Sequence, residues 1–479
     1  MSEKDITFNS TKRQSRVLPE DSFGDWRWRE ALAELMVPII GTLYRDGVRV
    51  LMYGQSLINE SPVSIMKAHR FIRQVEGNEL SEQETYPMLE AISKLNIADC
   101  EIDIGELAVR CPFFKDLKDD TSGLTTYINE ELETVINKDS SRPSEPKDIV
   151  LYGFGRIGRS ILRIIVEQDL DINVVAINDL GDYENLAYLF KHDSIMGVLD
   201  AEITIKKDML KINDRDIKLI SISDPSELPW KDLNVEIVVE STGIFTDRES
   251  LNKHIIAGAK KVLLTVPPKD EIDATIVLGV NDNNLTSESK LISNASCTTN
   301  CLAPIAKVLN DNFTIQSGLM TTVHAYTNDQ ALAETTHKDF RRGRNATQNI
   351  IPTSTGAAKA VGMVMPELKG KLDGMAMRVP VPNGSVVDLI VELDKSVTVE
   401  EINKAVKKAS ENELNGILSY SEVPLVSTDI LGNPNSSIYD ATSTEILENK
   451  HVRVVCWYDN EWGYSNRVVD LINKLIKEF

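Results

Sequence analysis

Hydrophobic positions follow two different periods along this chain. From Trp26 to about Ile136, apolar residues recur every three or four positions, which is the spacing of one face of an α-helix, and we find no period-two alternation. Ser61 followed by Pro62 has the composition of a helix cap and a first helical position. The pattern predicts a mainly α-helical N-terminal extension over residues 1–146.

A polar segment with two prolines and three serines, residues 137–147, predicts a linker. Beyond it, short apolar runs alternate with helical patterns, which favours a parallel α/β sheet. After about Cys301 the apolar runs lengthen, as in GLMTTVHAY and SVVDLIVEL, and they indicate a mixed or antiparallel sheet with a few helices. Between the linker and Cys301, the predicted strands are Ile149–Tyr152, Val174–Ile177, Ile237–Val239, Val262–Val266 and Thr275–Val280.

Composition narrows the class of protein. A length of 479 residues suggests about three domains, and a net charge of -21 argues against a nucleic-acid-binding or membrane-surface role. The N-terminus has no apolar core of the signal-peptide kind, and the most apolar early stretch, Leu35–Leu43, is too short to span a membrane. Five cysteines, an odd number, do not suggest a disulfide framework. We therefore expect a cytoplasmic protein with no nucleic-acid or membrane partner.

A glycine-rich turn stands where a dinucleotide-binding site needs one. Gly153-Phe-Gly155-Arg-Ile-Gly158 follows the first predicted strand and precedes a helix predicted at Ser160–Glu167. Asp179 ends the next strand, 21 positions after Gly158. Glycines allow close approach of a pyrophosphate to the helix N-terminus, and the acidic side chain accepts from ribose hydroxyls. A tight turn without a ligand is the alternative explanation.

A cysteine and a histidine form a candidate catalytic pair. Cys297 lies in SNASCTTNC directly before the apolar helical run LAPIAKVL, and a helix N-terminus lowers a thiol pKa. His324 ends a β-rich run and borders a polar loop, a position suited to a general base. A buried structural thiol is the alternative for any single cysteine, and we expect it for Cys301. Cysteine and histidine spacings fit no zinc site, so we predict no metal.

The motifs together resemble a known family. GFGRIGR, AINDL, ESTGIF, SNASCTTNC, TTVHAYTNDQ, GKLDGMAMRVPVPNGSVVDL and WYDNEWGYSNR occur in the order found in phosphorylating glyceraldehyde-3-phosphate dehydrogenases, from about residue 148 to the end. The resemblance implies an α/β Rossmann NAD-binding domain at 147–296, completed by a C-terminal helix at 465–479. It further implies an α+β mixed-sheet catalytic domain at 297–464, a homotetramer, and a loop at 326–351 that reaches a neighbouring subunit's cofactor.

The resemblance also implies residue roles. Cys297 forms a hemithioacetal and then a thioester with glyceraldehyde 3-phosphate, His324 moves the protons, and inorganic phosphate releases the product. The implied cofactor-binding residues are Gly153, Gly155, Arg156, Ile157, Gly158, Asp179, Thr242, Thr265, Asn460 and Tyr464. Thr327 and Arg378 match the substrate-phosphate site, and Ser296, Thr298, Thr355 and Gly356 match the attacking-phosphate site.

Two departures from the family concern the cofactor. Tyr152 stands where the family usually has an asparagine that can help hold the nucleotide, and Glu334-Thr335-Thr336 replaces a proline-containing apolar stretch. The second change relaxes discrimination against a 2′-phosphate, whereas Asp179 repels that group. We expect NAD to be preferred, with some use of NADP.

Two other functions stay open at the level of sequence. An erythrose-4-phosphate dehydrogenase shares nearly every motif but hydrolyses its thioester, and the complete attacking-phosphate set favours phosphorolysis instead. A non-catalytic NAD-binding scaffold does not need a thiol at a helix N-terminus. For the N-terminal extension, a packing appendage and a regulatory or docking module are equally compatible with the sequence, and its partner is unknown.

Overall fold

The computed structural model divides into two units, Met1–Arg142 and Pro143–Phe479, and each is described by itself. The residues it describes are 22–45, 48–53, 55–58, 60–76, 80–97, 100–111, 121–133, 135–136, 148–168 and 170–478. The linker predicted at 137–147 lies outside the described residues.

The first unit is mainly helical, as its hydrophobic period predicts. Ser61 caps α2, since its side-chain oxygen accepts from Ser64 N at 3.2 Å and Pro62 opens the helix. Ser81 caps α3 in a reciprocal arrangement with Glu84. The helices are α1 (Ser22–Arg45), α2 (Pro62–Glu76), α3 (Glu82–Ile92), α4 (Ile104–Arg110) and α5 (Thr121–Glu131).

A small sheet in this unit corrects the expectation that strand alternation is absent. β1 (Val48–Met52) pairs in parallel with β3 (Cys100–Asp103) and antiparallel with β2 (Gln55–Ser56). Val48 and Val50 are buried and Arg49 between them is exposed, so the period of two is present over five residues. So short a run between helical segments carries too few positions to stand out from them.

Polar side chains are buried within this helical unit. The guanidinium of Arg29 donates from Nε to Glu82 Oε2 at 2.5 Å, and both side chains are buried. His69, also buried, donates from Nδ1 to the Ile65 carbonyl at 2.7 Å, so its Nε2 accepts from Thr85 Oγ1 at 2.7 Å. Burial lowers the pKa of His69 below its usual 6.5, because the charged imidazolium loses its hydration.

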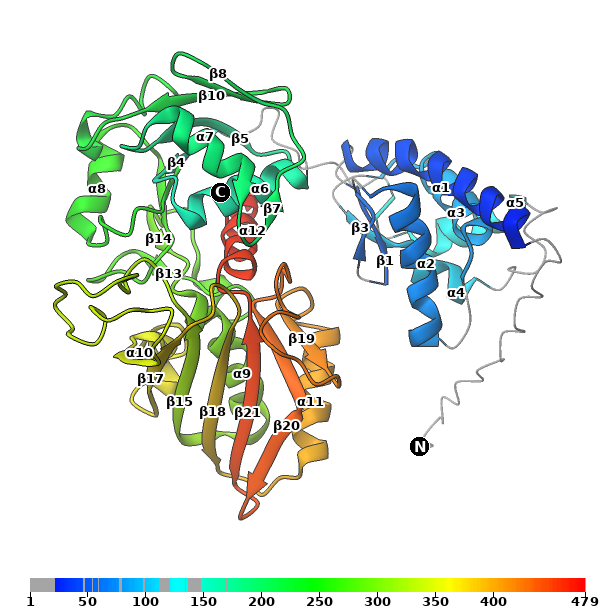
Figure 1. Cartoon of the computed structure of the whole chain (residues 1–479). Helices are drawn as coiled ribbons and strands as arrows, with labels where there is room; N and C mark the ends of the chain where they lie inside the picture. The colour runs from blue at the N-terminus through cyan, green and yellow to red at the C-terminus, as the bar shows by residue number, and fades with distance from the viewer. Residues whose placement is uncertain are drawn as a thin grey trace. The chain divides into compact units, whose positions relative to one another are not determined.

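The second unit begins with a nine-stranded sheet. Its central strands β14, β12, β11, β4, β5 and β10 are parallel, and β9 and β8 extend one edge antiparallel. Figure 1 shows helices on the faces of this sheet, with the C-terminal helix α12 beside α6. The elements are β4 (Asp148–Tyr152), α6 (Arg156–Glu167), β5 (Asn173–Asn178), α7 (Tyr183–Lys191), β6 (His192–Asp193), β7 (Gly197–Val198), β8 (Ile203–Lys206), β9 (Met209–Ile212), β10 (Arg215–Ile220), β11 (Ile237–Glu240), α8 (Arg248–Ile256), β12 (Lys261–Leu264), β13 (Ala274–Thr275), β14 (Leu291–Ser293) and α12 (Trp462–Glu478).

The remaining residues build a seven-stranded mixed sheet in the order β16-β17-β15-β18-β21-β20-β19. β15 pairs in parallel with β17 and antiparallel with β18, and Figure 1 shows these long strands side by side. Side chains of α9 and α11 share the buried core with this sheet. The elements are α9 (Cys297–Phe313), β15 (Ile315–Ala325), β16 (Ile351–Ser354), α10 (Ala357–Val364), β17 (Leu372–Val379), β18 (Ser385–Leu393), α11 (Val399–Glu411), β19 (Leu418–Ser421), β20 (Ser437–Leu447) and β21 (His451–Tyr458).

The architecture therefore confirms a parallel dinucleotide-type sheet and a mixed sheet. Two predicted strands are too long, because Val262–Val266 is a strand only up to Leu264 and Thr275–Val280 only up to Thr275. Val277 N donates to Asn281 Oδ1 at 2.8 Å, which turns the chain away from the sheet. Ile276 still donates from its backbone N–H to the Ser293 carbonyl at 2.8 Å, and both Ile276 and Val277 are buried in the core. Within the described part of the chain, we find no helix long and apolar enough to cross a membrane.

We predict that the first unit loses stability as the pH falls below 6.5. His69 has a lowered pKa in the fold and an ordinary one when unfolded, so the unfolded state takes up the proton and gains population in acid. Hydrogen–deuterium exchange of α2 and α3, corrected for intrinsic rates, measures this between pH 7.5 and 5. His69→Gln keeps polar groups that do not titrate and should remove most of the pH dependence. Equal acid sensitivity in the variant would contradict the assignment.

Candidate functional site

The glycine-rich turn between β4 and α6 leaves room for a ligand against its backbone. Gly153 has φ +92°, and a Cβ there would lie 2.8 Å from Thr242 N. A Cβ on Gly158 would lie 2.4 Å from the Gly153 carbonyl oxygen, so neither position accepts a side chain. A Cβ on Gly155 would meet nothing within 4 Å, and no side chain caps α6 there. The N–H groups at the start of α6 suit a pyrophosphate.

The acidic residue at the end of β5 lies beside this turn. Asp179 accepts from Phe154 N at 2.7 Å and from Gly181 N at 2.8 Å. Each carboxylate oxygen retains a lone pair that can accept from a ribose hydroxyl. Asp179 is therefore held in place by the loops that surround the candidate nucleotide site.

Arg156 and Ile157, which lie between the glycines of this turn, have side chains that contact other parts of the protein. The Arg156 side chain is committed to ion pairs with Glu461 and Asp193, donating from Nε to Glu461 Oε1 at 2.9 Å. Ile157 is half-buried and packs against the core of the parallel sheet. These two residues offer backbone groups to a ligand, since their side chains are occupied within the protein.

The other predicted cofactor residues have internal partners. Thr265 donates from Oγ1 to the Glu240 carbonyl, and the Tyr464 hydroxyl lies 2.6 Å from the Thr265 carbonyl oxygen. Asn460 accepts at Oδ1 from Gly384 N and Ser385 Oγ, at 3.2 and 2.7 Å. Those two bonds leave its amide nitrogen as the group available to a carboxamide oxygen.

The predicted nucleophile and base meet where α9 begins. Cys297 is the first residue of α9, and Ser296 caps the helix by accepting from Thr299 N at 3.1 Å. His324 is buried near the end of β15, and its Nε2 lies 3.5 Å from Cys297 Sγ. Arg378 lies directly beside His324 in the β15–β17 register. The structure thus brings these three predicted residues together.

The protonation of His324 depends on two competing partners of Nδ1. The Ala325 carbonyl oxygen lies 2.7 Å from Nδ1, and Arg378 Nη1 lies 2.6 Å from it. Arg378 only donates and a carbonyl only accepts, so Nδ1 bonds one of them at a time. When Nδ1–H donates to Ala325, Nε2 is the unprotonated nitrogen that can accept the Cys297 proton. Arg378 then donates to the same carbonyl, at 2.9 Å.

Burial and Arg378 set the charges of the pair. Burial, followed by the positive charge of Arg378, lowers the pKa of His324 to about 3. The lowered pKa expected for Cys297 at a helix N-terminus is wrong: burial raises the pKa of this thiol, while Arg378 acts in the opposite direction. Both net shifts favour a neutral thiol beside a neutral imidazole in the free site. A neutral imidazole is the form that can act as a base.

The predicted phosphate-site residues lie on several different elements. The Thr298 hydroxyl lies 2.8 Å from that of Tyr458, and Thr355 Oγ1 accepts from Ala357 N at 3.2 Å. Gly356 caps α10 with no side chain, and a Cβ there would meet nothing within 4 Å. Exposed Thr327 donates from its backbone N–H to Gln330 Oε1 at 3.0 Å.

Tyr458 and Glu461 were not predicted from the sequence. The buried Tyr458 hydroxyl lies between Thr298 Oγ1 and Thr322 Oγ1, at 2.8 Å from each, and its ring meets His324 edge-on. Both residues belong to WYDNEWGYSNR, and their positions two before Asn460 and one after it were the available signal. Tyr152 is buried, and its hydroxyl lies 3.3 Å from the Ser223 carbonyl oxygen.

The other thiols near this site are structural. Cys301 is fully buried, and burial raises its pKa well above the usual value, as it also raises that of Cys456. Among the described residues, no group of three His, Cys, Asp or Glu side chains is placed to hold a metal ion.

Comparison with known proteins gives one consistent result. The sequence model described as glyceraldehyde 3-phosphate dehydrogenase, NAD binding domain, matches residues 147–248, and the C-terminal domain model of the same family matches residues 296–460. Glyceraldehyde-3-phosphate dehydrogenase 2 of Streptomyces avermitilis is 56% identical over 322 residues, which is 67% of this chain and 96% of the relative. Glyceraldehyde-3-phosphate dehydrogenases of Priestia megaterium and Geobacillus stearothermophilus are each 58% identical, with the same shares covered.

We predict that His324→Asn slows alkylation of Cys297 by iodoacetamide at pH 7 by about 100-fold, since a positioned base contributes on that order. The asparagine removes the nitrogen 3.5 Å from Sγ. Mass spectrometry of the Cys297 peptide gives the rate. Cys301→Ser is the matched control, because that thiol is buried and should leave the rate unchanged. An unaltered rate in His324→Asn would contradict the pairing.

Proposed function

This chain belongs to the glyceraldehyde-3-phosphate dehydrogenase family, and on that premise we propose that it converts D-glyceraldehyde 3-phosphate, NAD and inorganic phosphate into 1,3-bisphosphoglycerate and NADH. The observation that supports this reaction most directly is the Cys297–His324 pair with Arg378 in register beside it. A thiol, a neutral base and a fixed guanidinium are what oxidation of a phosphorylated aldehyde through a thioester requires.

The first step forms a bond between Cys297 Sγ and the aldehyde carbon. The thiol proton passes to His324 Nε2, and the imidazolium that results is stabilised by donation from Nδ1 to the Ala325 carbonyl. The start of α9 and the Cys297 N–H favour negative charge on the attacked oxygen. The imidazolium then gives this proton to the attacked oxygen, and the product is a hemithioacetal.

Oxidation then requires loss of the hydroxyl proton of the hemithioacetal. His324, after giving up the proton it took in the first step, is the group placed to accept this one, and the carbon–oxygen bond becomes the thioester carbonyl. Bound NAD supplies the hydride acceptor. The open face of Gly155 and the amide nitrogen of Asn460 are the groups that would hold it.

Release of the product uses inorganic phosphate as the nucleophile. Attack of a phosphate oxygen on the thioester carbon breaks the carbon–sulfur bond and returns Cys297 as a thiolate, which His324 reprotonates. We assign the attacking phosphate to Ser296, Thr298, Thr355 and Gly356, and the substrate phosphate to Thr327 and Arg378. The Arg378 Nε is buried without a protein hydrogen-bond partner, so this N–H is available to donate to a bound phosphate.

NAD is the cofactor of the family, and we propose only a secondary use of NADP. The two backbone bonds to Asp179 hold its charge beside the glycine turn, where it repels a 2′-phosphate. Glu334 lies in the loop whose sequence differs from that of the family. It is exposed and accepts from Arg344 Nε at 3.3 Å, so its negative charge is partly offset.

We predict NADH formation from glyceraldehyde 3-phosphate that depends on phosphate, with NAD preferred over NADP by kcat/KM. Cys297→Ser should lower kcat by at least about 1,000-fold, since it removes the nucleophile, while Cys301→Ser retains activity. Absorbance at 340 nm, with and without phosphate and with erythrose 4-phosphate as the alternative aldehyde, measures all of this. Phosphate-independent turnover of erythrose 4-phosphate would overturn the assignment, and a catalytically silent protein would point to a scaffold.

Within the second unit we propose the boundaries 147–296 for the dinucleotide domain and 297–464 for the catalytic domain, with helix 465–479 completing the first. Residues of α12 belong to the same buried core as β4 and α6, which supports that division. The linker boundary at 137–147 stays a prediction.

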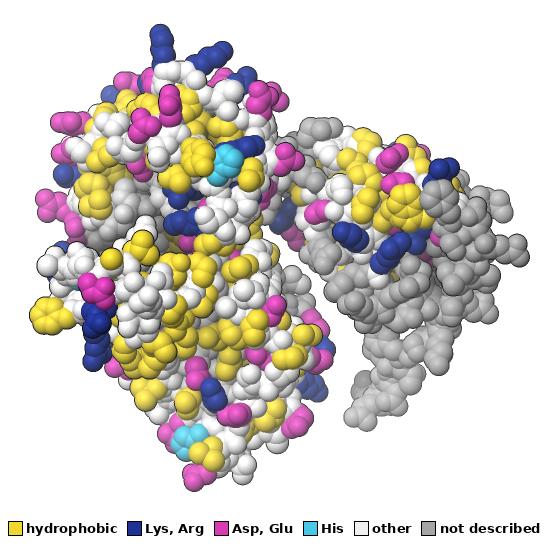
Figure 2. Space-filling view, in the orientation of Figure 1, with side chains coloured by type: hydrophobic (Ala, Val, Ile, Leu, Met, Phe, Trp, Pro, Cys, Tyr) yellow, Lys and Arg dark blue, Asp and Glu magenta, His cyan; other side chains and the backbone are white. Residues whose placement is uncertain are grey.

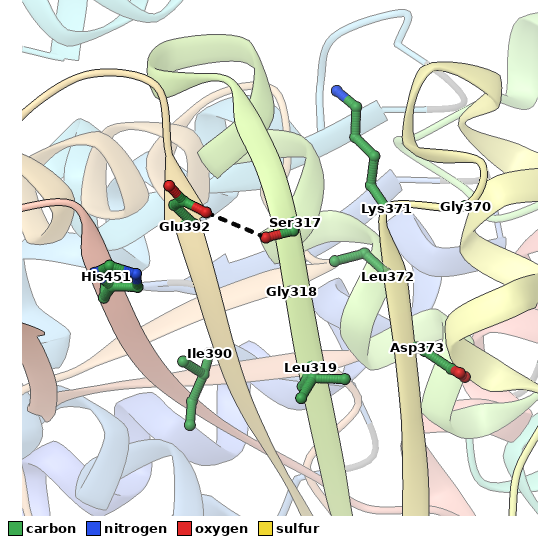
Figure 3. A pocket seen from close by; sticks show the side chains of 10 residues that line it. All are labelled: Ser317, Gly318, Leu319, Gly370, Lys371, Leu372, Asp373, Ile390, Glu392 and His451. Carbon is green, nitrogen blue, oxygen red and sulfur yellow. Dashed lines mark hydrogen bonds between the residues drawn. The ribbon is translucent and has the colours of Figure 1, made fainter.

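We also propose a homotetramer, supported by an uncovered apolar sheet face. Leu319 on β15 is 66% exposed, and Ile390 opposite it on β18 is 47% exposed. Figure 2 shows hydrophobic side chains gathered over this sheet. Both residues line a groove of about 410 Å³, together with residues that include Ser317, Lys371 and Glu392, as Figure 3 shows. Patches of this kind mark protein interfaces.

We predict that Leu319→Asp dissociates the assembly, because a carboxylate would be buried without a partner in the interface. Light scattering after gel filtration should report a smaller oligomer. Ile256→Asp on α8 is the control: Ile256 is 70% exposed, and its variant should keep the wild-type mass. The proposal fails if the two variants behave alike.

Cytoplasmic location is likewise proposed, on the free thiols of Cys297, Cys301 and Cys456. For residues 1–146 we propose no partner.

A further inference from the structure

We propose that Trp230, His254 and Glu240 form a buried chain that positions Thr242 in the NAD site. The proposal deepens the proposed function and rests on it, because Thr242 belongs to the cofactor-binding set inferred there. The three chain residues are positioning residues. They act on the cofactor only through the loop at 241–244.

All three side chains are fully buried under the parallel sheet. Trp230 donates from Nε1 to His254 Nδ1 at 3.1 Å, and His254 Nε2 lies 3.3 Å from Glu240 Oε2. An indole N–H only donates, so Nδ1 is the acceptor and Nε2 carries the proton. Trp230 therefore selects the tautomer in which His254 donates to Glu240.

Glu240 connects this chain to the loop. It ends β11, and its other oxygen, Oε1, accepts from both the backbone N–H of Thr242, at 2.8 Å, and the Thr242 hydroxyl. Thr242 Oγ1 accepts in turn from Ile244 N at 3.1 Å. The conformation of Thr242 is thus set by the orientation of one carboxylate.

The same loop is tied to the glycine turn. Ser241 donates from Oγ to the Gly153 carbonyl at 2.7 Å, and the missing Cβ of Gly153 admits Thr242 N. On the outer side, Gly243 has φ +71° with nothing within 4 Å of a Cβ, and Ile244 is 74% exposed. The hydrogen-bonded series Trp230–His254–Glu240–Thr242 therefore runs from the core to an open edge beside the residues that would hold the dinucleotide.

A purely structural role does not account for this arrangement. The surrounding cluster is apolar, with Val238, Leu228 and Ala259 among its members. Burying a carboxylate there carries a large desolvation cost, and hydrophobic residues of similar volume would pack as well. A fixed carboxylate gives what those cannot, a loop held in one conformation by charge-assisted bonds.

Tyr152 packs against this hydrogen-bonded chain of side chains, and that contact accounts for the inward orientation of the Tyr152 ring. Its ring meets His254 edge-on, with centroids 4.7 Å apart and an interplanar angle of 76°. The residue that departs from the family's asparagine thus supports the positioning chain through its contact with His254.

Two substitutions separate the two bonds of His254. Asparagine places an acceptor near Nδ1 but no donor near Nε2, whereas glutamine places a donor near Nε2. We expect His254→Asn to raise the Kd and KM for NAD by about tenfold, equivalent to about 1.4 kcal/mol. KM for glyceraldehyde 3-phosphate and kcat at saturating NAD should stay near wild type. His254→Gln should retain most of the NAD affinity.

Leu251→Ala is the matched control, since Leu251 is fully buried on the same helix, α8. It should lower Tm without changing the Kd for NAD, measured on the full chain by calorimetry. Equal effects of the two His254 variants on Kd, or none, would overturn the positioning role. If His254→Asn does not fold, Trp230→Phe is tested in its place. Phenylalanine removes the N–H that donates to His254 Nδ1, so NAD binding should weaken. An unchanged Kd for NAD would overturn the proposal. Failure of the wild type itself to bind NAD would instead contradict the proposed function.

Discussion

The site depends on how the chain crosses from the parallel sheet to the mixed sheet. β14 ends at Ser293 and α9 begins at Cys297, so only three residues separate a strand of the first sheet from a helix packed on the second. Cys297 consequently packs against both hydrophobic cores. This constraint places the thiol where it contacts both cores, with its Sγ 3.5 Å from Nε2 of the histidine near the end of β15.

The crossing is held at a local energetic cost. Ala295 has φ +55°, a left-handed conformation that costs a non-glycine residue about 1 kcal/mol. Ser293 Oγ accepts from Ala295 N at 3.0 Å, and the Tyr464 hydroxyl lies 2.9 Å from the Ala295 carbonyl oxygen. The C-terminal helix therefore helps fix the approach to the nucleophile from the far end of the sequence.

The electrostatics of the pair follow from the same packing. Because His324 is buried beside Arg378, its imidazole is neutral, and the thiol proton has a nearby acceptor. A substrate phosphate on Arg378 would offset the charge that lowers the His324 pKa. Substrate binding and activation of the base are then coupled through one guanidinium.

Local sequence patterns were enough to predict which elements form and which residue types carry chemistry. Hydrophobic period and glycine placement depend on neighbours in the chain, so the alternation of strand and helix, the turn at Gly153–Gly158 and the helix starting near Cys297 could all be predicted. The brief alternation at β1 and the buried run after Thr275 were misjudged, because burial and pairing depend on distant segments. The contact of His324 with Cys297, the register of Arg378 with His324 and the link from Glu240 through His254 to Trp230 became visible only in the folded chain. Those distances join residues far apart in sequence, and no local pattern encodes them.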